Sequence, residues 1–197
     1  LNDKGSSPGK EPSAKLVHQG MILGENGIKM GKRFPKYVVN PSDIVKQYGA
    51  DTLRLYEMFM GPMEVSKPWS PQGVEGARRF LNRVWTFFTN TAKLTAESDG
   101  TLDRVYHQTV KKVSTDFESL GFNTAISQMM IFVNACYKNG TCPKAYAESF
   151  VKMISCIAPH IGEEMWAILG HDDTLACESW PTWYEEKIKE DTLQIPV

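Results

Sequence analysis

The chain has 197 residues, of which 42% are hydrophobic and 11% aromatic, values typical of a protein with a packed core. The net charge is −1, no secretory signal opens the sequence, and no apolar run reaches the roughly 20 residues that a membrane helix requires. We therefore expect a cytoplasmic protein. The four cysteines match no zinc-binding spacing, so we expect no metal site; they are Cys136, Cys142, Cys156 and Cys177.

The net charge hides an asymmetry between the two halves of the chain. Residues 1–96 hold 14 lysines and arginines against 8 acidic residues, a balance of +6, whereas residues 97–197 hold 8 against 15, a balance of −7. A basic half indicates a polyanionic partner. Chance clustering of solvated surface charge is the alternative.

Residues 1–14 are polar, contain Gly, Ser and Pro, and predict a flexible segment. The first residue is Leu1 rather than methionine, which suggests a piece of a longer protein, although a processed mature protein could begin in the same way. A short apolar patch over residues 16–23 leads into the turn signal of residues 24–27. This pattern predicts a hairpin, or a strand that leads into a loop.

A basic loop follows over residues 29–37, which hold three lysines and one arginine. Pro35 disfavours a helical conformation at Phe34 and so predicts a loop. Lys29 and Lys32 are three positions apart and suit a chain of phosphates, because lysine is a flexible point charge. A solvated basic loop without a ligand is the alternative.

The remainder of the chain predicts α-helices joined by short loops. Asn40 or Ser42 can cap the first helix, Gly49 interrupts it, and a second helix begins at Asp51. Apolar residues at steps of three and four indicate further helices: residues 74–96, residues 102–120, one that Asn123 caps, one that begins at Pro143, and residues 160–169. The expected fold is mainly α, a helical bundle preceded by a short loop and strand.

Several sequence motifs carry a family resemblance. The chain reads Lys-Met-Gly-Lys-Arg over residues 29–33, Val-Val-Asn-Pro-Ser-Asp-Ile-Val over residues 38–45 and Tyr-Gly-Ala-Asp-Thr-Leu-Arg over residues 48–54. These motifs resemble the Lys-Met-Ser-Lys-Ser loop and the segments after it in class I aminoacyl-tRNA synthetases. Residues 56–62, 66–69 and 73–85 are similar to the leucyl-tRNA synthetases of the bacterial type, as are Pro159-His160, residues 163–166 and residues 179–181.

The resemblance covers about residues 15–197 and implies a domain plan. Residues 15–45 would end a catalytic core, residues 46–185 would form a helical tRNA-binding bundle, and residues 186–197 would begin a link to a C-terminal domain. The whole enzyme would use ATP and Mg2+ to activate leucine and would transfer it to tRNA-Leu, as a monomer. This part would bind no cofactor tightly and would be inactive by itself.

The resemblance also implies roles for the basic loop. Lys29, Met30, Gly31, Lys32 and Arg33 would bind ATP, and the two lysines would act in catalysis by contacting the phosphates. Lys32 matches the lysine that stabilises the departing pyrophosphate. The chain departs from the family motif where Gly31 and Arg33 replace serines, which adds flexibility and one cation, and one extra residue precedes Val38.

A second set of residues is expected to meet RNA phosphates or to stack on a sugar or base: Lys67, Trp69, Arg78, Arg79 and Arg83. The resemblance implies that the bundle docks along the inner side of the tRNA. The alternative is pairing within the protein, for example of Arg79 with Glu75. The aromatic residues Trp85, Phe87 and Phe88 are expected in the core.

His160 begins the sequence His-Ile-Gly-Glu, which superficially resembles the His-Ile-Gly-His motif of class I synthetases. That motif belongs far upstream of the lysine loop, whereas His160 follows the loop and falls within a helical pattern. We therefore predict a helix-start residue that packs in the bundle.

Two other functional classes stay open at this point. A free-standing helical RNA-binding module would need no phosphate-following loop. A helical protein-interaction scaffold fits poorly with the basic first half and the predicted arginine face.

Overall fold

The computed structural model describes residue 13 and residues 15–189. Almost all of the predicted flexible segment and the end of the predicted C-terminal link lie outside the described residues. The described part is mainly helical, as predicted. Its elements in order are β1 (Ile22–Leu23), η2 (Pro35–Tyr37), α1 (Pro41–Tyr48), α2 (Ala50–Phe59), β2 (Lys67–Pro68), α3 (Pro71–Phe88), η3 (Thr91–Lys93), β3 (Leu94–Thr95), α4 (Asp103–Glu118), α5 (Phe122–Asn139), β4 (Cys142–Pro143), α6 (Lys144–Ser155), α7 (Pro159–Ile168), η4 (Leu175–Cys177) and η5 (Glu185–Lys187).

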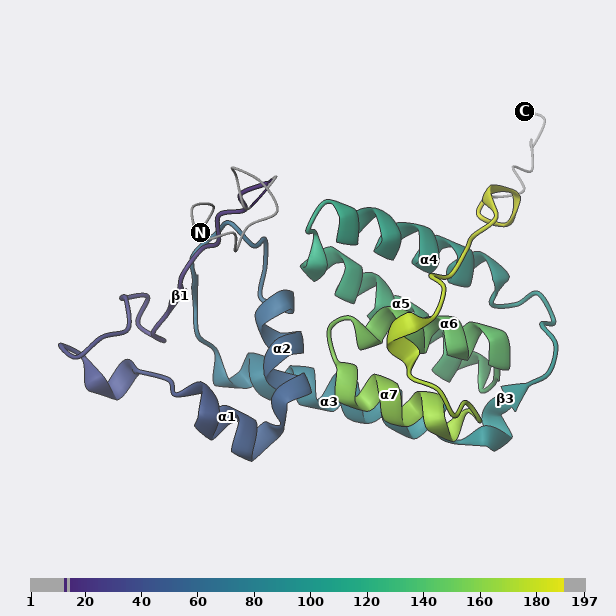
Figure 1. The fold of residues 1–197 in the computed structure, drawn as a ribbon, viewed down its shortest axis with the longest axis horizontal. Helices are drawn as coiled ribbons and strands as arrows, with labels where there is room; N and C mark the ends of the chain where they lie inside the picture. Colours follow the sequence, from purple (N-terminus) through teal and green to yellow (C-terminus); the bar gives the residue numbers. More distant parts are fainter. Residues whose placement is uncertain (1–12, 14, 190–197) are drawn as a thin grey trace, which may run out of the picture.

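The helices form two groups that α3 connects (Figure 1). The first group contains β1, the basic loop, α1 and α2, and the loop lies at the outer edge of the molecule. The second group is the bundle of α4 to α7. Helix α3 packs against α2 at one end and against α5 and α7 further along. It therefore contacts both groups.

The strand expected near the start of the chain is present but short. Strand β1 pairs with β2 in parallel, with Ile22 opposite Lys67. The turn after β1 closes with a hydrogen bond from the Gly24 amide to the Ile28 carbonyl oxygen at 2.9 Å, and Leu23 forms an antiparallel bridge with Lys29. The basic loop therefore starts from a fixed point on a small sheet.

Local chemistry explains where most helices begin and end. The Asn40 side chain accepts a hydrogen bond from the Ser42 amide at 3.0 Å and caps α1. Gly49 has a φ of +90°, a backbone conformation that glycine adopts readily, and it separates α1 from α2. The prediction that Asn123 caps α5 is wrong, because that helix begins at Phe122 after Gly121.

The predicted limits of α3 need correction at both ends. The helix begins at Pro71 rather than at residue 74, because the Ser70 side chain accepts a hydrogen bond from the Gly73 amide. It ends at Phe88 rather than at residue 96. After a short turn the chain enters β3, which pairs in parallel with β4.

A layer of aromatic rings fills the bundle core. The side chains of Phe87, Phe88, Phe132 and Phe150 are fully buried, and the rings of Phe88 and Phe150 stack with centroids 4.7 Å apart. Burial confirms the core prediction for Phe87 and Phe88. The core prediction is wrong for Trp85, which lies on the outer side of α3 and is 37% exposed.

Helix α2 holds the corner between α6 and α7 through two side chains. The Asp51 carboxylate accepts hydrogen bonds from the amides of His160 and Ile161 at the start of α7, at 3.4 and 2.7 Å. The Arg54 guanidinium donates to the carbonyl oxygens of Ile157 and Cys156 at the end of α6, at 2.7 and 3.3 Å. Both unsatisfied helix ends thus find their partners on α2.

The α6–α7 corner also requires close backbone approach. A Cβ atom placed on Gly162 would lie 2.9 Å from the Ser155 Cα atom and 2.5 Å from its Cβ atom. Glycine is therefore needed at this position of α7 for the two helices to meet.

Candidate functional site

The basic loop presents its cations to solvent. The side chains of Lys29, Lys32 and Arg33 are exposed, and within the described residues none of them forms an ion pair. The Arg33 guanidinium lies 5.5 Å from the centroid of the Phe34 ring, a contact that leaves its charge available. A cluster of uncompensated cations at the edge of a molecule attracts polyphosphate groups.

Met30 differs from its neighbours because it anchors the loop. Its side chain packs against the core, and its sulfur atom accepts a hydrogen bond from the Val39 amide at 3.4 Å. It lines a cavity of about 160 Å³ together with Leu53 and Trp69. Met30 therefore fixes the loop backbone between Lys29 and Lys32, whose side chains are exposed.

The three arginines predicted to contact tRNA all lie on the exposed surface of α3. The Arg78 guanidinium donates to the Tyr48 carbonyl oxygen at 3.0 Å. The Arg83 guanidinium donates to the Asn134 side-chain oxygen at 2.9 Å and lies 4.8 Å from the Tyr137 ring centroid. These partners are neutral, so the positive charge of α3 is not cancelled.

Arg79 differs from Arg78 and Arg83 because no hydrogen bond joins its guanidinium group to another described residue. It is exposed, and in the described part of the chain no ion pair joins it to Glu75. The pairing that we considered as the alternative is therefore absent from the structure. The Arg79 side chain is free to meet a partner outside the protein.

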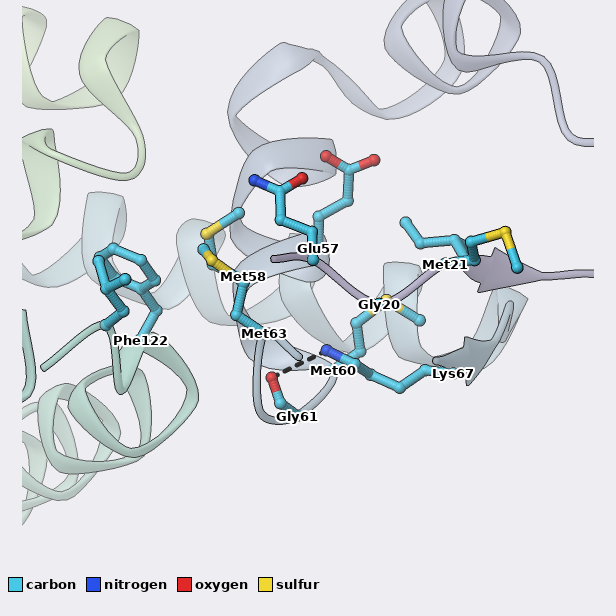
Figure 2. A pocket seen from close by; sticks show the side chains of 12 residues that line it. Gly20, Met21, Glu57, Met58, Met60, Gly61, Met63, Lys67 and Phe122 are labelled. Atoms are coloured by element: carbon cyan, nitrogen blue, oxygen red, sulfur yellow. Dashed lines mark hydrogen bonds between the residues drawn. The ribbon is translucent and has the colours of Figure 1, made fainter. Parts of the chain in front are cut away.

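The partly exposed Lys67 side chain reaches toward the Gly61 carbonyl oxygen (Figure 2). Its ammonium group donates to the Gly61 carbonyl oxygen at 3.0 Å, and it lines a cavity of about 210 Å³ with several methionines and Glu57. Burial lowers the pKa of Lys67 below its ordinary value, and Glu64 offsets part of that shift. Burial also raises the pKa of Glu57, and Arg54 opposes the shift. The structure thus separates Lys67 from the exposed arginines.

The two tryptophans have positions opposite to those expected. Trp69 is only 7% exposed and makes an edge-on contact with Tyr56, with ring centroids 4.9 Å apart, so it offers no open face for stacking. Trp85 is exposed and lies two helical turns after Arg78 on the same side of α3. Its spacing of seven from Arg78 was the signal in the sequence that could have identified it.

His160 is confirmed as a residue in the first turn of a helix, but it does not pack in the bundle. Its side chain is 76% exposed, and its Nδ1 atom lies 2.8 Å from the Asp51 Oδ1 atom. It lines a surface pocket that Arg78 also lines. Sequence reasoning placed the helix correctly and missed the exposure.

No helix in the described residues has the length and apolar character to cross a membrane. The same part of the chain has no group of three or more His, Cys, Asp or Glu side chains arranged to hold a metal ion.

Two family models match the chain. The model for class I tRNA synthetases (I, L, M and V) matches residues 6–65, and the model for the anticodon-binding domain of tRNA ligase matches residues 99–195. The first match contains the basic loop, and the second contains the bundle. The boundary between them falls around α3, the helix that connects the two groups.

A solved structure covers almost the whole chain. It is the crystal structure of the ternary complex of Agrobacterium radiobacter K84 agnB2 LeuRS, tRNA and LeuAMS, with a TM-score of 0.80 and 31% sequence identity over 96% of this chain. The chain spans 27% of the length of that relative. From the two family matches, over residues 6–65 and 99–195, and from this structural similarity we conclude that the chain belongs to the class I tRNA synthetases and contains an anticodon-binding domain similar to that of the leucyl-tRNA synthetase structure.

Proposed function

We propose that the chain is the part of a leucine–tRNA ligase that contacts ATP phosphates and docks tRNA-Leu. The enzyme would activate leucine with ATP and transfer it to the tRNA, and would act in the cytoplasm as a monomer. The observation that carries this proposal is the combination in one fold of an exposed lysine loop, which lies within the synthetase match, and an arginine-bearing helix, which lies between that match and the anticodon-binding match.

The loop supports the ATP part of the proposal through its physical properties. Lys29 and Lys32 are exposed and flank the anchored Met30. Such side chains can follow a phosphate as charge develops on it, and contacts that tighten in the transition state accelerate the reaction most. Gly31 and Arg33 would complete the phosphate contacts, and Mg2+ would arrive with ATP as part of the substrate.

Helix α3 supports the tRNA part. Arg79 is free, and Arg78 and Arg83 bond only neutral groups, so the three arginines can attract RNA phosphates. Trp85 adds an exposed ring on the same helix on which a sugar or base could stack. We propose Arg79 as the main tRNA contact. For Lys67 and Trp69 we propose a structural role in the loop before α3.

The proposed domain plan differs from the two groups seen in the fold, because it places α2 with the bundle although α2 also packs against α1. We propose that residues 15–45 end the catalytic part and that residues 46–185 form the tRNA-binding bundle. Asp51 and Arg54 at the start of the second unit hold the α6–α7 corner, which supports placing α2 with the bundle.

The test is titration of the chain with fluorescently labelled tRNA-Leu and with a non-cognate tRNA at two salt concentrations. We expect binding that weakens steeply with salt, because phosphate contacts release counterions. Arg79→Glu should weaken binding by about tenfold or more, since it replaces an attraction by a repulsion.

The matched control is Lys138→Glu, which makes the same charge change at an exposed position on α5. It should weaken binding much less than Arg79→Glu. Absence of binding at low salt, or equal losses for the two variants, would contradict the proposed docking surface. If the chain were instead a free-standing RNA-binding module, it would bind tRNA-Leu and the non-cognate tRNA equally.

A further inference from the structure

We propose that Arg78 and His160 together bind one ribose–phosphate unit of tRNA. They line a surface pocket of about 370 Å³ between the α1–α2 junction, α3 and α7, which Tyr48 and Asp51 also line. The inference rests on the proposed function, because it names a contact within the tRNA interface. It adds α7 to that interface.

Arg78 is held in place and still has hydrogen-bond donors to offer. One of its terminal nitrogens donates to the Tyr48 carbonyl oxygen at 3.0 Å, and the side chain is exposed. A guanidinium group has five N–H donors in a fixed plane, so this single bond orients the group and leaves several donors open. Guanidinium groups match the geometry of phosphate oxygens.

His160 is oriented from behind by Asp51. The Nδ1 atom lies 2.8 Å from the carboxylate, and a carboxylate accepts hydrogen bonds, so Nδ1 carries the hydrogen. The Nε2 atom has no hydrogen bond to the described residues. It can accept from a ribose 2′-hydroxyl when the ring is neutral and donate to a phosphate oxygen when the ring is protonated.

The charge that a ligand meets in this pocket is positive. Asp51 is the acidic residue of the lining, but its side chain is only 11% exposed. Its oxygens already accept from the amides of His160 and Ile161 as well as from the imidazole. The exposed groups are the guanidinium of Arg78 and the imidazole of His160, and both complement the RNA backbone.

Two substitutions of His160 separate RNA binding from a purely structural role. His160→Asn places an amide nitrogen where Nδ1 lies, so it keeps the Asp51 contact and loses Nε2. His160→Gln places an amide where Nε2 lies and gives up the Nδ1 contact. We expect His160→Asn to weaken tRNA binding about three- to tenfold with an unchanged Tm, and His160→Gln to bind within about twofold of the unaltered chain.

The affinities would be measured by fluorescence anisotropy, and the Tm by circular dichroism. A purely structural role predicts the reverse order, with His160→Asn unaffected and His160→Gln impaired, and that result would overturn the proposal. Full affinity in both variants would overturn it as well.

Arg78→Gln supplies a second, independent measurement. It should weaken tRNA binding about tenfold and reduce the slope of log affinity against log salt by about one, because one phosphate contact is lost. Lys138→Gln removes the same charge from α5 and should leave affinity within about twofold. Equal effects of the two substitutions would contradict the proposal that Arg78 binds an RNA phosphate in this pocket.

The outcomes also separate the two proposals. If the unaltered chain fails to bind tRNA at low salt, the proposed function itself fails. If the chain binds and Arg79→Glu weakens binding, but His160→Asn and Arg78→Gln have no effect, only the pocket is wrong.

Discussion

Asp51 is a buried carboxylate whose hydrogen bonds all reach another helix. Its oxygens accept the first amides of α7 and the Nδ1 hydrogen of His160. A cap supplied by a distant helix has the same effect as an ordinary N-cap, because it satisfies amides that have no partner within their own helix. It also places a negative charge at the positive end of α7.

We expect Asp51→Ala to lower the free energy of unfolding by about 2 kcal/mol, since the buried amides of α7 would lose a charged acceptor. The measurement is urea unfolding of the chain, followed by circular dichroism. Asp43→Ala is the matched control, because Asp43 is an exposed residue in the first turn of α1 and should contribute only a few tenths of a kcal/mol. Equal losses would show that the Asp51 contacts are unimportant.

The roles of single residues differ in how far the sequence could reveal them. The resemblance placed Lys29 and Lys32 in the loop, and Met30 between them could be read as an apolar anchor in a polar segment. The partners of Asp51 lie more than 100 positions away, and no local pattern indicates such a pairing. Trp69 was expected at the surface and is buried, whereas Trp85 was expected in the core and is exposed. Local sequence could not reveal this either, because burial depends on what packs over each ring.

At the scale of elements, several contacts dock the segment after α7 onto α4, and one of them is a cluster around Asp103. Lys187 on η5, Tyr146 on α6 and Ser98 all donate to the Asp103 carboxylate at the start of α4. Burial tends to raise the pKa of Asp103, but the hydrogen bonds from Lys187, Ser98 and Tyr146 outweigh it and lower the pKa to about 2. The carboxylate is therefore charged in the folded state well into the acid range.

This shift predicts a loss of stability in acid. A carboxylate whose folded pKa lies below its unfolded pKa stabilises the fold above the unfolded value of 3.8, and the effect disappears as pH falls toward about 2. We expect Asp103 to contribute about 1–2 kcal/mol at neutral pH. Urea unfolding from about pH 5 down to about pH 2 measures this, and the profile of Asp103→Asn should be flatter. Parallel profiles would exclude the cluster as the cause.

The neighbouring His107 acts in the same direction at higher pH. Its Nδ1 atom accepts a hydrogen bond from the Tyr184 amide at 3.3 Å. Burial lowers its pKa below the ordinary 6.5, Lys187 lowers it further, and Asp103 and Glu186 oppose the shift. The neutral ring is therefore the form that fits the fold, so acidification below 6.5 weakens the attachment of this segment before Asp103 is protonated.

Helix type was predictable from the sequence, whereas some helix ends were not. The combination of Ser70 and Pro71 is a start signal for α3 that local chemistry explains. The end of α3 had no such signal, because apolar residues continue at helical spacing to Ala92. The chain leaves the helix at Phe88 and Leu94 pairs instead with Cys142, a partner that only the folded bundle provides.

At the scale of the whole molecule, the chain spans only 27% of the length of the synthetase structure that it matches. Lys29 and Lys32 would act on a nucleotide that other parts of a synthetase hold. We therefore expect no leucine-dependent ATP–pyrophosphate exchange by this chain alone. The assay would include a complete leucyl-tRNA synthetase as a positive control. Exchange catalysed by the chain would show that the loop region contains more of the active site than we propose.

The hydrogen bonds between α2 and the α6–α7 corner also affect the order in which the chain folds. The Arg54–Ile157 and Asp51–Ile161 contacts join residues 103 and 110 positions apart. Closing a loop of that length costs more entropy than forming any of the helix pairs between them, and contacts of this kind are made slowly. The helices from α3 to α6 can therefore assemble through near neighbours first, and the bonds of α2 to the α6–α7 corner form late.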